Sequence, residues 1–96
     1  MTTPTEVAAI FERIREAIES CGPKAHKNDH AFVGISVCIT EGWNTRGQII
    51  GALGRLGLKA GHIACVLDDG AKGPPAERRW HLDLTGRYSL PEHLAA

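Results

Sequence analysis

The stretch TRGQIIGALGRLGLKAGHIACVLDDG, residues 45–70, is the most informative part of the sequence, because it contains two apolar-periodic segments separated by a short turn. Asn44 or Thr45 provides an N-cap for the first segment, whose apolar residues recur at three- and four-residue spacing: Ile49, Ile50, Leu53 and Leu56. Three glycines inside it each weaken a helix by about 1 kcal/mol relative to alanine: Gly47, Gly51 and Gly54. We interpret them as sites where another backbone packs closely. Gly57 ends this first helix.

The second segment of the stretch predicts another helix after a turn over residues 58–61. This helix is expected over about residues 60–68, and its inward-facing residues are Ile63, Val66 and Leu67. Gly70 follows as its C-terminal stop. Two helices joined by about four residues that include a glycine form a helix-turn-helix unit.

A β-hairpin is predicted beyond this unit. The Gly/Pro-rich residues 70–77 read as a loop without periodicity. The next run alternates and places on one side Trp80, Leu82 and Leu84, and a second run alternates with Tyr88 and Leu90. Thr85-Gly86 between the runs is a turn, so the two runs form a hairpin. We expect its aromatic residues to anchor it to the core rather than to stack on bases, and residues 91–96 to form a tail.

An amphipathic helix is predicted over residues 4–21. Thr3 and Glu6 fit a capping box, with Pro4 at the first helical position. A single apolar stripe follows: Val7, Ile10, Phe11, Ile14, Ala17, Ile18 and Cys21. Gly22-Pro23 ends this helix.

The middle of the chain is less decisive. Residues 24–30 are polar and predict a loop. In residues 31–40, an alternating β-branched pattern favours a strand: Val33, Ile35, Val37 and Ile39. A helical stripe also fits the same residues: Ala31, Ile35 and Cys38. Local propensity favours the strand, but the fold indicated by the other elements prefers a helix here, and we favour the helix.

Length and charge limit the number of domains and the classes of binding protein to which the chain could belong. The 96 residues predict one domain over residues 1–96, with ordinary globular usage of 43% hydrophobic and 23% charged residues. Eleven basic residues balance eleven acidic ones, which argues against a strongly basic nucleic-acid coat and against a polybasic membrane binder. Residues 44–87 nevertheless carry a balance of +3, as a phosphate-contacting surface would. We see no signal peptide and no apolar run long enough for a membrane span.

Cysteine and histidine residues give little support for chemistry. Cys21, Cys38 and Cys65 are odd in number and lack a C-x-x-C spacing, so we expect small core residues, no disulfide framework and a cytoplasmic location. His26 and His30 lie near Cys21 but supply too few converging ligands for zinc. A Cys/His nucleophile pair would need an activated thiolate, which an apolar environment opposes. We therefore expect no metal, no cofactor and no enzymatic activity.

The order helix, turn, helix, loop and hairpin resembles the winged helix-turn-helix superfamily. The matching stretches are TRGQIIGALGRLGL (45–58), KAGHIACVLDDG (59–70) and RRWHLDLTGRYSL (78–90). The resemblance implies a mainly α fold with a small β-hairpin, in which a winged-helix core over residues 31–90 follows the extra N-terminal helix. It also implies that the second helix of the unit enters the major groove of double-stranded DNA and that the hairpin, the wing, lies along the phosphates.

The resemblance further implies a set of contact residues. Thr45 and Arg46 would face phosphate, the outward side of the reading helix would present Lys59, Gly61, His62 and Cys65, and the wing would carry Lys72, Arg78, Arg79 and Arg87. These expectations describe a small DNA-binding protein, a transcriptional regulator.

Two features favour a different partner. The reading helix is poor in base-reading side chains, and Asp68 and Asp69 near its end would repel phosphate. The alternative is a protein-interaction module on the same scaffold, such as a small inhibitor or adaptor from a mobile element. In either case the N-terminal amphipathic helix leads us to expect a homodimer.

Overall fold

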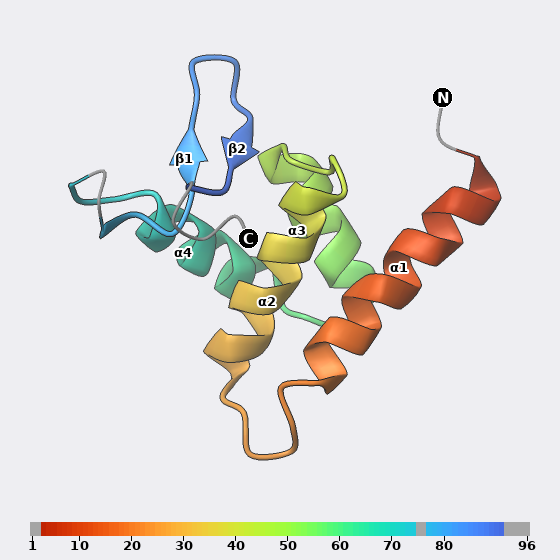
Figure 1. Cartoon of the computed structure of the whole chain (residues 1–96). Helices are drawn as coiled ribbons and strands as arrows, with labels where there is room; N and C mark the ends of the chain where they lie inside the picture. Colours follow the sequence, from red (N-terminus) through yellow and green to blue (C-terminus); the bar gives the residue numbers. More distant parts are fainter. Residues whose placement is uncertain (1–2, 75–76, 92–96) are drawn as a thin grey trace.

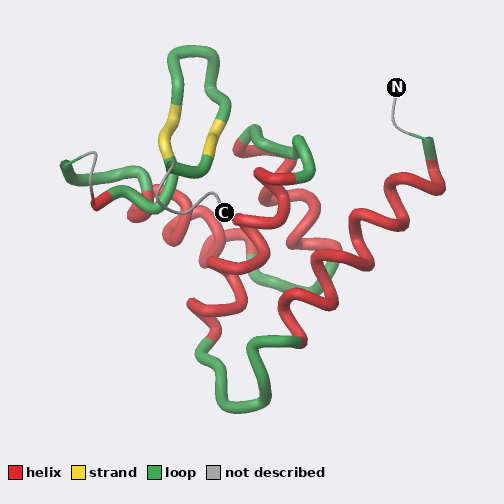
Figure 2. Tube along the Cα trace, in the orientation of Figure 1, coloured by secondary structure: helices red, strands yellow, loops and turns green. Residues whose placement is uncertain are grey.

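The computed structural model describes residues 3–74 and 77–91, and this part of the chain is mainly helical with one small antiparallel sheet, as predicted (Figures 1 and 2). Its elements are α1 (Pro4–Glu19), α2 (Lys27–Thr40), α3 (Arg46–Arg55), α4 (Ala60–Gly70), β1 (His81–Leu82) and β2 (Tyr88–Ser89). None of the helices in the described part has the length and apolar character that crossing a membrane requires. The expected tail is outside this part beyond Pro91, which is itself buried.

Helix α1 forms as its sequence predicts and ends two residues early. The Glu6 N–H donates to Thr3 Oγ1 over 3.1 Å, which caps the first turn. Ile10 and Ile14 are buried in the common core. The helix ends at Glu19 rather than at residue 21, and Gly22 turns the chain with a φ of 86°.

Helix α2 begins inside the segment that we predicted as a loop, so that prediction is wrong for residues 27–30. The Asn28 N–H donates to His26 Nδ1 over 3.1 Å, and the His26 N–H donates to the Asp29 carboxylate over 3.0 Å. These two bonds satisfy donors that an uncapped helix end leaves unpaired. The sequence concealed them because histidine is not among the common N-cap residues.

The helix favoured over residues 31–40 is confirmed. Five residues of α2 are buried at helical spacing: Ala31, Gly34, Ile35, Cys38 and Ile39. Through them α2 packs against α1, α3, α4 and β2, so it is the central element of the core. The β-branched residues did not impose a strand because burial on one helical stripe removes more apolar surface from water.

Close packing at glycine occurs, but not at the glycines we predicted. Gly47, Gly51 and Gly54 lie on the exposed side of α3, where an added Cβ would meet nothing within 4 Å. Instead, a Cβ at Gly34 would lie 2.8 Å from Leu53 Cδ2, and a Cβ at Gly70 would lie 2.5 Å from the Trp80 ring. The glycines of α3 therefore leave an open helix face.

The hairpin is anchored at its base and rises away from the helices (Figure 1). His81 pairs with Ser89 and Leu82 with Tyr88. Trp80 and Tyr88 are buried, as expected of anchoring aromatics. The strands contain only two residues each, so the expected alternation does not continue to the tip: Leu82 is 51% exposed and Leu84 fully exposed.

The chain before α3 fixes the hairpin to the helices. Thr45 forms an isolated antiparallel bridge with Arg87, and the Tyr88 N–H donates to the Asn44 carbonyl oxygen over 2.7 Å. The linker between α2 and α3 thus acts as a third, minimal strand. It holds the hairpin in a defined position beside the start of α3.

Candidate nucleic-acid interface

Helix α4 presents one face to solvent and the other to the core. Helix α4 packs against α2 and α3 and buries Ile63 and Leu67, while Gly70 is buried beneath the Trp80 ring. The exposed residues on and just before the helix are Lys59, Ala60, Gly61, Cys65, Asp68 and Asp69. Cys65 therefore lies outward, as the winged-helix resemblance implied, and is not the core residue that its apolar neighbours suggested. This division of faces leaves one side of α4 exposed from Lys59 to Asp69.

The N-terminus of α4 differs from those of the other three helices. Thr3, His26 and Thr45 each accept a hydrogen bond at the start of their helix, whereas Lys59 makes no side-chain cap. The first N–H groups of an uncapped helix remain free to bind water or an anion. Lys59 adds a positive charge at the same place, and exposed Gly61 leaves the backbone uncovered.

The two carboxylates of α4 are both engaged by cations of this chain. The Arg46 guanidinium at the start of α3 pairs with the Asp68 carboxylate, which raises the pKa of Arg46. Lys72 Nζ lies 3.7 Å from Asp69 Oδ1. The sequence predicted that Arg46 would face phosphate. In the structure its guanidinium pairs with the Asp68 carboxylate instead. The pairing also reduces the repulsion that Asp68 would exert on a phosphate.

The wing arginines divide into two groups. Arg78 Nε donates to the Gly73 carbonyl oxygen over 2.8 Å, and the Arg79 guanidinium lies 4.5 Å above the Phe32 ring centre, so both stand beside the C-terminal end of α4. Arg87 instead donates to Asn44 Oδ1 over 3.0 Å at the base of the hairpin. Thr45 is likewise used inside the chain, because its hydroxyl accepts from the Gln48 N–H and donates to Gln48 Oε1.

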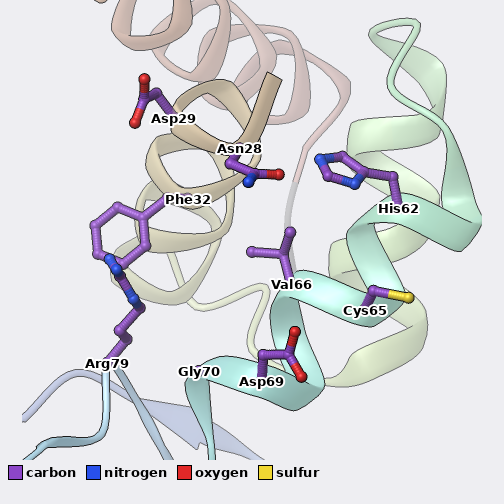
Figure 3. Close-up of a pocket in the computed structure, with 9 residues that line it drawn as sticks. All are labelled: Asn28, Asp29, Phe32, His62, Cys65, Val66, Asp69, Gly70 and Arg79. Carbon is purple, nitrogen blue, oxygen red and sulfur yellow. The ribbon is translucent and has the colours of Figure 1, made fainter. Parts of the chain in front are cut away.

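A cavity of about 320 Å³ lies between the first turn of α2, the outer side of α4 and Arg79 (Figure 3). The His62 ring points across it toward Asn28, and among the described residues its buried Nε2 has no hydrogen-bond partner. His62 therefore lines the cavity and is only partly exposed, rather than standing out from α4. Sequence reasoning missed Asn28 here because it assigned the first turn of α2 to a loop, and it gave no sign that Phe32, in the favoured helix, would face α4.

The remaining candidates for chemistry in the described part of the chain are metal-ligating side chains and thiols. Among residues 3–74 and 77–91, no three His, Cys, Asp or Glu side chains are arranged to hold a metal ion. The three cysteines are free, and burial raises the pKa of the Cys38 thiol to about 12. His93, at the end of the chain, lies outside the described residues.

Comparison of the chain with models of known protein families, with curated proteins and with solved structures finds no match. The interface is therefore defined by the geometry of its residues.

Proposed function

We propose that the chain is a small winged-helix DNA-binding protein, a transcriptional regulator, that contacts duplex DNA through the outer face of α4. The arrangement of α3, a short turn, α4 and a hairpin held beside the start of α3 supports this proposal. Helix-turn-helix proteins place the second helix of the pair in the major groove. The open face of α4 is the corresponding surface here.

The charge around α4 is the observation that carries the proposal. Asp68 and Asp69 are paired within the chain, whereas Lys59, Arg78 and Arg79 have no carboxylate partner among the described residues. Lys59 lies at the N-terminal end of α4, and the two arginines lie near its C-terminal end. Cations at both ends of an exposed helix suit two phosphate contacts with the helix between them.

The composition of the α4 face predicts that phosphate contacts dominate over base reading. Lys59 is the one long cationic side chain at the start of the helix, while His62 is turned into the cavity. Arginine, lysine, asparagine and glutamine make most direct base contacts in the major groove. We expect binding with a strong salt dependence and modest discrimination between sequences.

A titration of fluorescently labelled random-sequence duplex DNA, followed by anisotropy at several salt concentrations, tests the proposal. We expect binding at low salt and a logarithm of affinity that falls linearly with the logarithm of salt concentration, by about 0.9 for each phosphate neutralised. Absence of binding at low salt, or binding with no salt dependence, would contradict it.

Matched arginine variants locate the contact. Arg79→Ala should weaken binding and reduce the salt slope by about 1. Arg15→Ala removes the same charge from the exposed side of α1 and should leave the slope unchanged. An equal loss in both variants would mean that DNA responds to overall charge and not to the α4 face.

A protein-interaction module, such as a small inhibitor or adaptor, is the second candidate. The exposed leucines of the hairpin favour it, because solvent-exposed apolar side chains that lie close together mark contact sites. Failure to bind duplex DNA at low salt would favour this candidate. A pull-down with the chain that recovers only nucleic acid would contradict it.

A further inference from the structure

The hairpin tip carries the exposed large apolar side chains of the described chain. Leu82 is 51% exposed and Leu84 is 107% exposed, so the described residues leave the Leu84 side chain uncovered. In Figure 1 the tip stands clear of all four helices. Folding removes little or no apolar surface of Leu84 from water, so a partner could still bury this side chain.

The tip is held in shape rather than left loose. Asp83 Oδ1 accepts hydrogen bonds from the Thr85 N–H over 2.8 Å, the Thr85 hydroxyl over 2.6 Å and the Arg87 N–H over 3.0 Å. Gly86 completes the turn with a φ of 84°. Because this turn is already ordered, a partner that binds the leucines would not have to order the loop first.

An apolar groove lies on another part of the same molecule, between α1 and the glycine face of α3. It consists of two adjoining hollows of about 310 and 380 Å³ that share Phe11 and Arg55, and the ion-paired Glu12 and Arg15 line the second beside Arg55. Val7 and Trp43 extend its apolar wall, and the Phe11 and Trp43 rings meet edge to face at 5.1 Å. Exposed Gly47 and Gly51 form its shallow floor, where none of the described residues lies within 4 Å of an added Cβ.

We propose that the occupant of this α1–α3 groove is the hairpin tip of a second copy of the chain. Leu84 and Leu82 would insert into the groove and pack against the Phe11 and Trp43 rings. Asp83, between the two leucines, brings a carboxylate toward Arg55, which has no ion-pair partner among the described residues. The apolar and charged parts of the tip thus both find complements in the groove.

The same chemistry makes DNA a poor occupant for the tip. Asp83 is negative, and the nearest cation, Arg87, is directed back to Asn44 at the hairpin base. A carboxylate at the tip would approach the phosphates first. The dimer contact and the proposed DNA contact therefore use different surfaces, the tip and groove for one and the α4 face for the other.

Reciprocal exchange closes the assembly. When each copy inserts its tip into the groove of the other, the two contacts are related by a two-fold axis and no tip or groove remains free. A one-way exchange would instead propagate into an open filament. We expect a closed dimer.

Two single variants separate the partners of this contact. Leu84→Asp alters a side chain that the described residues leave fully exposed, and Gly51→Leu fills the groove at a helix position where an added Cβ meets nothing within 4 Å. Sedimentation velocity over a wide concentration range should show a wild-type dimer and a dissociation constant raised by about a hundredfold or more in either variant. A symmetric dimer contains the substitution twice, and each copy should raise the dissociation constant by about tenfold or more.

Gly61→Leu is the matched control for the groove variant. Gly61 is also an exposed helix glycine with open space around its Cα, but it belongs to α4 and does not line the groove. This variant should dimerise like the wild type. Circular dichroism and the urea unfolding midpoint of each chain establish that a loss of association is not a loss of folding.

Mixing the two defective chains gives the decisive result. A Leu84→Asp chain keeps an intact groove and a Gly51→Leu chain keeps an intact tip, so their mixture restores one of the two contacts. We expect a heterodimer at concentrations at which each variant alone is monomeric. A monomeric wild type, unchanged association of the variants, or the absence of rescue on mixing would each overturn the proposal.

Discussion

Trp80 is the residue that attaches the hairpin to the helices. Its indole Nε1–H donates to the Leu67 carbonyl oxygen over 2.7 Å, and its ring stacks on Phe32 with ring centres 5.5 Å apart. The edge of the ring lies against Gly70, where no side chain fits. Burial, a satisfied donor and close packing thus act together on one residue.

Replacing Gly70 tests this attachment. In Gly70→Ala the added methyl would lie 2.5 Å from the buried Trp80 ring, so the ring or the helix end must move. We expect urea unfolding to show a loss of about 1–3 kcal/mol in the free energy of unfolding. Gly61→Ala on the same helix meets nothing within 4 Å and should raise that free energy by up to about 1 kcal/mol. Equal effects of the two changes would contradict this account of Trp80.

Asp83 makes the hairpin turn sensitive to pH. Its hydrogen bond from the Thr85 side chain, with further bonds from backbone N–H groups, lowers the pKa of this carboxyl below its usual range. The ionised form stabilises the turn at pH values above the ordinary aspartate range. That contribution is lost as the pH falls through the lower value of the folded chain.

An NMR titration measures this effect directly. The Thr85 and Arg87 amide resonances should move with a midpoint below the pKa of an aspartate in an unfolded peptide. Asp83→Asn keeps an acceptor oxygen but does not titrate, so the transition should disappear. A midpoint at or above the ordinary aspartate value would contradict the assigned hydrogen bonds.

At the scale of elements, the sequence predicted the four described helices and the caps of α1 and α3, but not the start of α2 or the residues against which each helix packs. Periodicity located α1, α3 and α4, because one buried stripe fixes the helical register. The start of α2 was missed because its cap is a histidine. The glycines of α3 were misassigned because a glycine in the sequence does not show whether another residue packs against it. The close contacts occur at Gly34, beside Leu53, and at Gly70, beside Trp80.

The open face of α3 has a measurable consequence. Gly51→Ala adds a methyl into open space and reduces the backbone freedom of the unfolded chain, so the monomer should gain about 1 kcal/mol in free energy of unfolding. Gly34→Ala on α2 should lose stability, because its methyl would lie 2.8 Å from buried Leu53. Urea unfolding at dilute concentration compares the two. A destabilised Gly51→Ala chain would mean that this face is covered.

At the scale of the whole molecule, the order of elements was predictable and the candidate site only in part. The sequence placed Lys59 and the arginines near α4, since short connections keep neighbouring elements together. It did not reveal that Arg46 pairs with Asp68, a contact between residues 22 apart. Nor did it indicate that the Arg87 side chain bonds to Asn44. It also did not show that Leu82 and Leu84 stay exposed, because this depends on strands that are only two residues long.

An NMR map of the DNA contact on the isotopically labelled full chain tests whether the α4 face binds DNA. On addition of a random-sequence duplex at low salt, we expect amide chemical-shift changes concentrated over residues 59–65 and at Arg78 and Arg79, which reverse as salt is added. No change at low salt, or changes confined to the hairpin tip and the α1–α3 groove, would contradict the claim that the α4 face binds DNA.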